Sequence, residues 1–244
     1  MENTKRIIKY QYKESKISMS KFWLTMFLVS LFLYIINKRS GPNVSSGIIV
    51  SGDITSISIL GVSLFALLIY LIIFNYENLY KNFPMAISFS VTRKDFALST
   101  IFKGLVIAAT SGLIQGVLLK LDPIIVRLVD KTPMYDFGIF NTNTDNIIYL
   151  IFTLFIILFT VSSMWNLLAS LNYRFGYKLW IVFLGLYFIS SFIRSWHAGI
   201  WTFSINILTT RIDGVQLLKL VLITIISQGL AYLNTINTNI KRKA

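Results

Sequence analysis

The sequence predicts an all-α membrane protein whose residues 1–244 form a single domain with six transmembrane helices. Hydrophobic residues make up 55% of the chain and charged residues only 14%, whereas soluble domains average about 25% charged. The mean hydropathy is +0.68. Apolar runs recur at close to the roughly 20 residues that a helix needs to cross a bilayer. They cover residues 22–36, 57–74, 96–119, 147–169, 179–193 and 215–233.

The distribution of basic residues predicts the orientation of these spans. With a cytoplasmic N-terminus, fifteen of the 23 Lys and Arg residues lie on or near the inner side and eight on or near the outer side. This imbalance follows the positive-inside rule and predicts a multi-pass protein of the cell membrane with both termini in the cytoplasm. The net charge of +13 is therefore interpreted as a topology signal and a contact to anionic membrane lipid. Nucleic acid is not an expected partner.

The basic segment before the first span is too polar to cross a membrane. Lysines at helical spacing lie beside Ile8, Tyr12 and Met19, which would form an apolar stripe. This pattern predicts an amphipathic helix on the cytoplasmic surface, and a frayed basic tail is the alternative. The next connection, residues 38–55, is rich in Ser and Gly and is expected to be a flexible external turn.

The connection between the second and third spans, residues 75–95, is more apolar than a solvated turn requires. Pro84 suits the first turn of a short helix, where its missing N–H costs little. Thr92 and Asp95 have capping-box spacing, which predicts that a new helix begins near Arg93. We interpret the segment as a cytoplasmic helix on which another protein docks. An interfacial helix that lies on the bilayer is the alternative.

The third span carries a stripe of small residues, one in every four positions: Gly104, Ala108, Gly112 and Gly116. Such a stripe allows two helix backbones to approach closely in lipid. The partner helix could belong to this chain or to a second subunit, and we expect packing within the chain. Residues 120–146 then form the longest expected external loop, with an apolar stretch at 123–129 that suits a helix on the outer surface.

The last three spans carry further signals. Ser162, Ser163 and Asn166 can hydrogen-bond across helices or line a path, and packing is the preferred interpretation. The short link 170–178 predicts that spans four and five form an antiparallel hairpin. Residues 195–214 are too mixed to span, which predicts short re-entrant helices between spans five and six, with Trp196 and Trp201 in the aromatic belt.

Residues that carry enzyme chemistry are scarce. The chain has no cysteine and a single histidine, His197, and it lacks both the P-loop and the nucleophile-elbow motifs. No acid lies in the middle of a span, and Lys103 and Lys219 lie near span ends, where their side chains can snorkel to the interface. We therefore expect a protein that is not an enzyme and binds no cofactor, with any ATP hydrolysis on a separate subunit.

This layout resembles the permease subunits of ABC-2-type ATP-binding-cassette transporters of Gram-positive bacteria, including phenol-soluble-modulin exporters and lantibiotic-immunity permeases. The segment NFPMAISFSVTRKDF is similar to their coupling-helix region, which often carries a Ser-x-x-x-Thr/Ser-Arg-Lys pattern. Phe89–Ser90–Val91 stands where many relatives have a glycine. By this resemblance, the residues that couple the permease to its ATPase are Phe83, Pro84, Met85, Ile87, Ser88, Phe89, Thr92, Arg93 and Lys94.

The resemblance implies a dimer with a second permease, either a copy or a paralogue, together with cytoplasmic P-loop ATPase subunits that hold ATP and Mg. The cargo would be amphipathic, a peptide or a lipid-like molecule. Phe83→Asp or Arg93→Glu is expected to uncouple the ATPase without preventing membrane insertion. A non-transporting membrane sensor or assembly partner is the alternative function. An intramembrane protease would need paired acids or several histidines within its spans.

Overall fold

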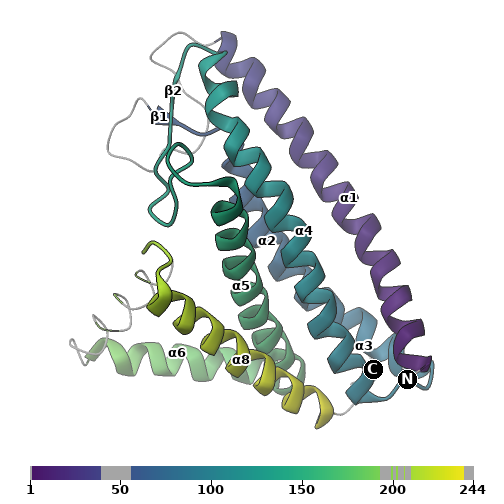
Figure 1. Cartoon of the computed structure of the whole chain (residues 1–244). Coiled ribbons are helices and arrows are strands. Elements are labelled where there is room, and N and C mark those ends of the chain that lie inside the picture. The colour runs from purple at the N-terminus through teal and green to yellow at the C-terminus, as the bar shows by residue number, and fades with distance from the viewer. Residues whose placement is uncertain are drawn as a thin grey trace.

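The structure is a computed structural model that describes residues 2–39, 56–192 and 210–238, with Gly199, Thr202 and Asn206 between the last two ranges. Helices dominate the described residues (Figure 1). The elements in chain order are α1 (Glu2–Arg39), β1 (Ser56–Ile57), α2 (Val62–Glu77), the π-helical segment η1 (Asn78–Asn82), α3 (Phe83–Ser88), α4 (Arg93–Arg127), β2 (Thr132–Pro133), α5 (Ile147–Phe175), α6 (Tyr177–Phe192) and α8 (Gly214–Ile236).

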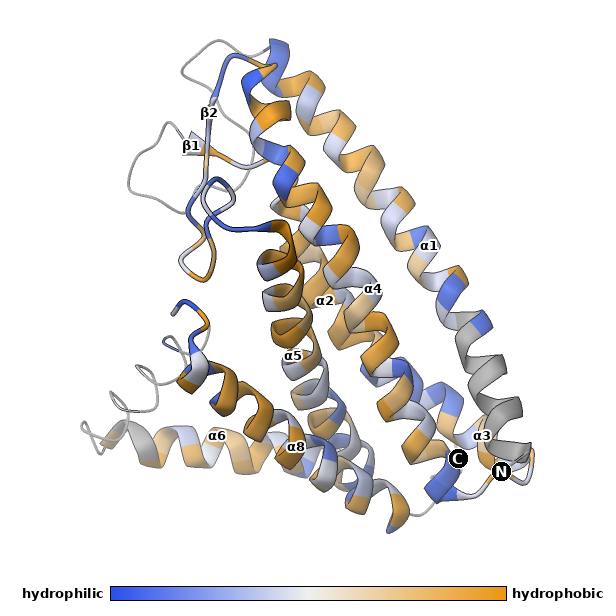
Figure 2. Cartoon of the chain, in the orientation of Figure 1, coloured by the Kyte–Doolittle hydropathy of each residue, from blue (hydrophilic) through white to orange (hydrophobic). Residues whose placement is uncertain are grey.

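Five helical stretches among the described residues are long and apolar enough to cross a membrane. They are Ser15–Arg39, Val62–Ser88, Arg93–Arg127, Ile147–Phe175 and Gly214–Ile236, and they coincide with the first four predicted spans and the sixth. The helices are mainly apolar, and hydrophilic residues gather in the connections and at helix ends (Figure 2). The predicted class, an all-α membrane protein, is confirmed.

The predicted fifth span corresponds to α6, which departs from the expected hairpin. Its 16 residues cover about 24 Å, short of a hydrocarbon core of roughly 30 Å. The chain turns at Gly176, which has a φ of 63°, and α6 then runs away from α5 to the left of the view (Figure 1). The hairpin prediction is therefore wrong: α6 does not run back along α5, which packs instead against α2, α4 and α8.

The predicted surface helix and the first span are one continuous helix, α1, of 38 residues. The expected boundary between them does not occur, because residues 2–39 contain neither proline nor glycine and nothing else there ends a helix. The side chains of Ile8 and Tyr12, which belong to the predicted apolar stripe, lie outside the described ones. Figure 1 shows α1 standing alongside α4.

The small-residue stripe of α4 lies against α5 within the same chain. A Cβ added at Gly112 would come within 3.0 Å of the backbone nitrogen of Phe155, and one at Gly116 within 2.6 Å of Cγ1 of Ile151. Ala108 is fully buried. The two helices are therefore close enough that only small residues fit between their backbones, which is the contact such a stripe permits in lipid.

The end of the bundle opposite α3 is closed by short strands and a buried acid. β1 and β2 pair in parallel, with Ser56 opposite Thr132. The carboxylate of Asp122, 1% exposed, accepts hydrogen bonds from the Ser58 hydroxyl at 2.6 Å and from the backbone N–H of Leu60 at 2.7 Å. The expected external loop 120–146 thus begins later than predicted, because α4 continues through Arg127 and uses Asp122 to hold the start of α2.

Two further predictions concern segments that lie wholly or mostly outside the described residues. Most of the segment expected to form re-entrant helices, including Trp196, His197 and Trp201, lies outside the described residues. The same holds for residues 40–55 of the expected external turn.

Candidate functional site

The candidate site lies at the α3 end of the bundle, where α2 passes through η1 into α3 without a break (Figure 1). The predicted short helix is confirmed as α3, and Pro84 lies in its first turn. It is not an isolated helix between two loops, however, because Val62–Ser88 is one continuous helical stretch. The π-helical segment η1 widens the helix locally, and such segments are rare and often occur at functional sites.

A tight turn joins α3 to α4. Val91 N–H donates to the carbonyl of Ala86 at 3.2 Å, and Ser90 has a φ of 60°, in the left-handed region that favours glycine. Thr92 then caps α4, because its hydroxyl oxygen accepts from the backbone N–H of Asp95 at 3.1 Å. The predicted cap and the predicted helix start at Arg93 are confirmed. The turn and the cap hold α3 close against the first turn of α4.

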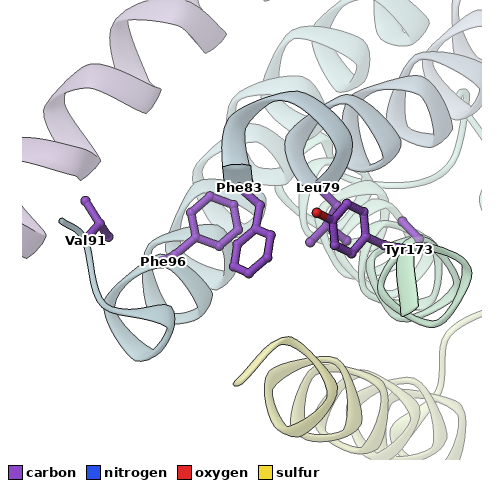
Figure 3. Packing of buried hydrophobic residues seen from close by; sticks show 6 residues of the cluster. Leu79, Phe83, Val91, Phe96 and Tyr173 are labelled. Atoms are coloured by element: carbon purple, nitrogen blue, oxygen red, sulfur yellow. The ribbon is translucent and has the colours of Figure 1, made fainter. Parts of the chain in front are cut away.

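A buried apolar cluster ties this end of the bundle together. Phe83 lies between Phe96 of α4 and Tyr173 of α5, with ring centroids 5.1 Å and 5.7 Å away (Figure 3). Leu79 of η1 and Val91 of the turn belong to the same cluster. Four elements therefore share one core, which we name the Phe83 cluster: Leu79, Phe83, Val91, Phe96, Ala169 and Tyr173.

The outward surface of the segment carries an exposed aromatic ring. Phe89 is 73% exposed, and Ser88 before it and Lys94 in the first turn of α4 are exposed as well. Met85 and Ile87 are half-buried. A large apolar side chain held at a helix end between polar neighbours is the kind of feature that marks contact with a protein or a membrane surface. We name this surface the Phe89 tip: Ser88, Phe89, Ser90, Thr92 and Lys94.

Two of the predicted coupling residues, Phe83 and Arg93, contact other parts of this chain. Phe83 is fully buried, so its side chain offers no surface to a partner and Phe83→Asp would bury a charge in the core. Arg93 donates from Nη1 to the carbonyl of Ile236 at 3.2 Å. A cation at the C-terminal end of α8 is favourable to the helix dipole, so Arg93→Glu would disturb α8 directly. Neither substitution isolates a docking contact.

Polar side chains connect the last turn of α2 and the segment η1 to the neighbouring helices. The Asn78 side chain donates to the Thr100 hydroxyl at 3.0 Å and accepts from Nζ of Lys103 at 3.1 Å. Asn75 donates to the Ser162 hydroxyl of α5 at 3.2 Å. Lys103 was expected to snorkel, but it is 8% exposed and its ammonium also lies 4.4 Å from the centroid of the Phe74 ring. A movement of α3 is therefore connected to α4 and α5 through buried bonds.

Sequence reasoning missed these asparagines, although a signal was available. Asn75, Asn78 and Asn82 recur at intervals of three and four residues, which places them on one face of a helix. All three are buried. Polar residues on one face of an apolar helix predict contact with another helix, because lipid cannot satisfy their hydrogen bonds.

A second polar seam joins α5 to α8. The hydroxyls of Thr160 and Thr224 lie 2.9 Å apart, and the Gln228 amide donates to Ser163 at 2.9 Å and accepts from Asn166 at 3.1 Å. All five side chains are buried. Ser163 and Asn166 therefore act in helix packing, the preferred interpretation of the sequence, and they do not line an open path between these two helices.

The fold and the site define an all-α membrane protein. Among the described residues, no three His, Cys, Asp or Glu side chains lie close enough together to hold a metal ion. No protein-family model matches the chain, and neither a curated protein nor a solved structure matches it significantly.

Proposed function

We propose that this chain is the transmembrane subunit of an ATP-driven exporter of the ABC-2 type, working with a second permease and a separate cytoplasmic P-loop ATPase. The Phe89 tip is the surface on which the ATPase docks. The main support is the position of Phe89. Its ring is 73% exposed at the end of α3, which is continuous with one candidate span and lies directly before the Thr92 cap of the next one.

The proposed coupling works through rigid contacts. A partner that pushes on Phe89 displaces α3, and the Phe83 cluster passes that displacement to α4 and α5, because packed cores do not deform continuously. The Asn78 bonds to Thr100 and Lys103 carry the same movement to α4. The cargo of such an exporter would be amphipathic, a peptide or a lipid-like molecule, in keeping with the resemblance described above.

The test is to isolate the tagged chain in mild detergent from its native host and to identify the proteins that co-purify. A P-loop ATPase in roughly equal amount is expected with the unmodified chain. Phe89→Asp is expected to remove the ATPase while leaving the amount of inserted chain unchanged. The matched control is Phe175→Asp, because Phe175 is also an exposed aromatic, at 48%, at the end of α5.

Two outcomes contradict the proposal in different ways. If no ATPase co-purifies under conditions that preserve other membrane complexes, the exporter assignment is wrong and a sensor or assembly role takes its place. If an ATPase co-purifies equally with the unmodified chain and with Phe89→Asp, the assignment stands but the Phe89 tip is not the docking surface.

A further inference from the structure

A pocket of about 360 Å³ lies between α1 and α4. This volume is at the lower end of the range that protein pockets use for small ligands, roughly 300–1,000 Å³. The two helices make a polar contact across it, where the Thr110 hydroxyl lies 3.5 Å from the sulfur of Met19. The pocket lies outside the Phe83 cluster and the Phe89 tip, and it shares with the proposed coupling only the residue Lys103.

The walls of the pocket are apolar along most of its length. On α4 they are formed by Phe102, Val106, Ile107 and Ile114, and on α1 by Trp23. From Phe102 to Ile114 the α4 wall is about 18 Å long at 1.5 Å per residue. A narrow apolar groove of that length, open between two helices of a membrane bundle, fits an extended acyl chain.

Positive charge gathers in the half of the pocket nearer α3. Lys16 of α1 is exposed, and Lys103 of α4 reaches the pocket while it bonds to Asn78. No acid is among the described residues that line the pocket. Glu77 lies beyond Lys103, in a separate small cavity, and forms an ion pair with Lys81 at 3.1 Å. The pocket therefore presents cations at one end and hydrocarbon at the other.

We propose that the pocket between α1 and α4 is a binding site for an anionic phospholipid, with its acyl chain against Val106 and Ile114 and its phosphate beside Lys16 and Lys103. Basic pockets between transmembrane helices on the cytoplasmic side are a recurring way of binding anionic headgroups. The positive-inside count predicts that the α3 end faces the cytoplasm, which puts these lysines at the inner leaflet. This proposal stands independently of the exporter assignment.

Trp23, which lines the pocket, serves as the reporter. The full-length chain is prepared with Trp165, Trp180, Trp196 and Trp201 replaced by Phe and is placed in nanodiscs that contain phospholipids with brominated acyl chains. Brominated phosphatidylglycerol is expected to quench the emission of Trp23 at a lower mole fraction than brominated phosphatidylcholine. A lysine at a membrane surface gives about a fivefold preference for an anionic lipid, so two lysines predict a difference of about fivefold to thirtyfold.

Three variants separate a specific site from general contact with the bilayer. Val106→Phe places a larger side chain in the apolar part of the pocket, and it is expected to weaken the quenching of Trp23 by both lipids. Lys16→Gln is expected to reduce the preference for phosphatidylglycerol about fivefold. Lys13→Gln is the matched control, because Lys13 is exposed on the same helix but is not among the residues that line the pocket, and it is expected to change nothing.

The result that overturns the proposal is equal quenching by the two brominated lipids in the unmodified chain. A preference that survives Lys16→Gln and Val106→Phe unchanged would overturn it as well, because the anionic lipid would then bind elsewhere on the protein. Each variant is first shown to elute as a single species, so that a failure to fold is not counted as a loss of binding.

Discussion

Phe83 and Phe89 lie six positions apart in the same segment. Truncating each to alanine should show which of the two rings contributes to the packed core at the α3 end and which lies on its surface. Phe83 is fully buried, whereas Phe89 is 73% exposed. Both residues were expected from the sequence to contact a partner. The structure instead predicts that Phe83→Ala lowers the stability of the chain and that Phe89→Ala leaves it nearly unchanged.

The magnitude for Phe83 follows from its surroundings. Truncating a buried Phe to Ala costs about 3–5 kcal/mol, and the cost is larger where the walls of the new cavity cannot relax. Here the walls are Phe96 and Tyr173, whose ring centroids are 5.1 Å and 5.7 Å from that of Phe83, on two long helices. For a chain of this length that loss corresponds to a decrease in Tm of about 6–20 °C. Phe89→Ala should cost less than about 0.5 kcal/mol.

The assay is thermal unfolding of the purified chain in one detergent, followed by the fraction that still elutes as a single species after heating. Membrane insertion is measured alongside, so that the two variants are compared at equal amounts of folded protein. Co-purification of the ATPase then provides an independent readout. Phe89→Ala should weaken ATPase binding at unchanged Tm, and Phe83→Ala should lower Tm whether or not a partner is present.

The reverse pattern of stabilities would contradict both expectations. If Phe83→Ala left Tm within about 2 °C of the unmodified chain, less than 1 kcal/mol would have been lost, and the Phe83 cluster could not be a packed core. If Phe89→Ala lowered Tm as much as Phe83→Ala, its ring would be packed in the folded protein and not exposed.

Three further predictions concern the close contact between α4 and α5, the buried carboxylate of Asp122 and the turn between α3 and α4. Gly112→Leu should destabilise the chain by about 1–3 kcal/mol, because its side chain would push α4 away from Phe155, while Gly185→Leu on the open face of α6 should not. Asp122→Ala should cost at least about 3 kcal/mol, since three buried donors lose their acceptor, and Asp122→Asn should cost less because one oxygen remains. Ser90→Gly should stabilise the chain by about 1 kcal/mol, because it relieves the left-handed φ of 60°. Thermal unfolding measures all three.

The outcomes that contradict these three predictions are specific. If Gly112→Leu and Gly185→Leu lowered the stability of the chain equally, the loss would come from leucine itself and not from the contact of α4 with α5. No loss from Asp122→Ala would mean that the start of α2 is held by other contacts. A lower Tm for Ser90→Gly would mean that the flexibility gained by the unfolded chain outweighs the relieved strain.

The local features of the coupling segment were predictable because their causes are local. Pro84 and the Thr92–Asp95 pair act on the helix turns in which they lie, so the start of α4 could be read from a few neighbouring residues. The left-handed conformation of Ser90, with a φ of 60°, was not predicted. Which ring of the segment faces inward was not predictable, because Phe83 is buried by Tyr173, a residue 90 positions away.

Hydropathy, helix caps and helix breakers act over a few turns of chain, so they were enough to predict the all-α membrane class, five of the long apolar helices and the start of α4. Three features became evident only in the folded chain: α6 turns away from α5, Asp122 holds the start of α2, and Phe89 instead of Phe83 forms the exposed tip. These features were not predictable because burial and hydrogen-bond partners depend on residues distant in sequence. Ser58 and Asp122, for instance, are 64 positions apart and 2.6 Å from each other.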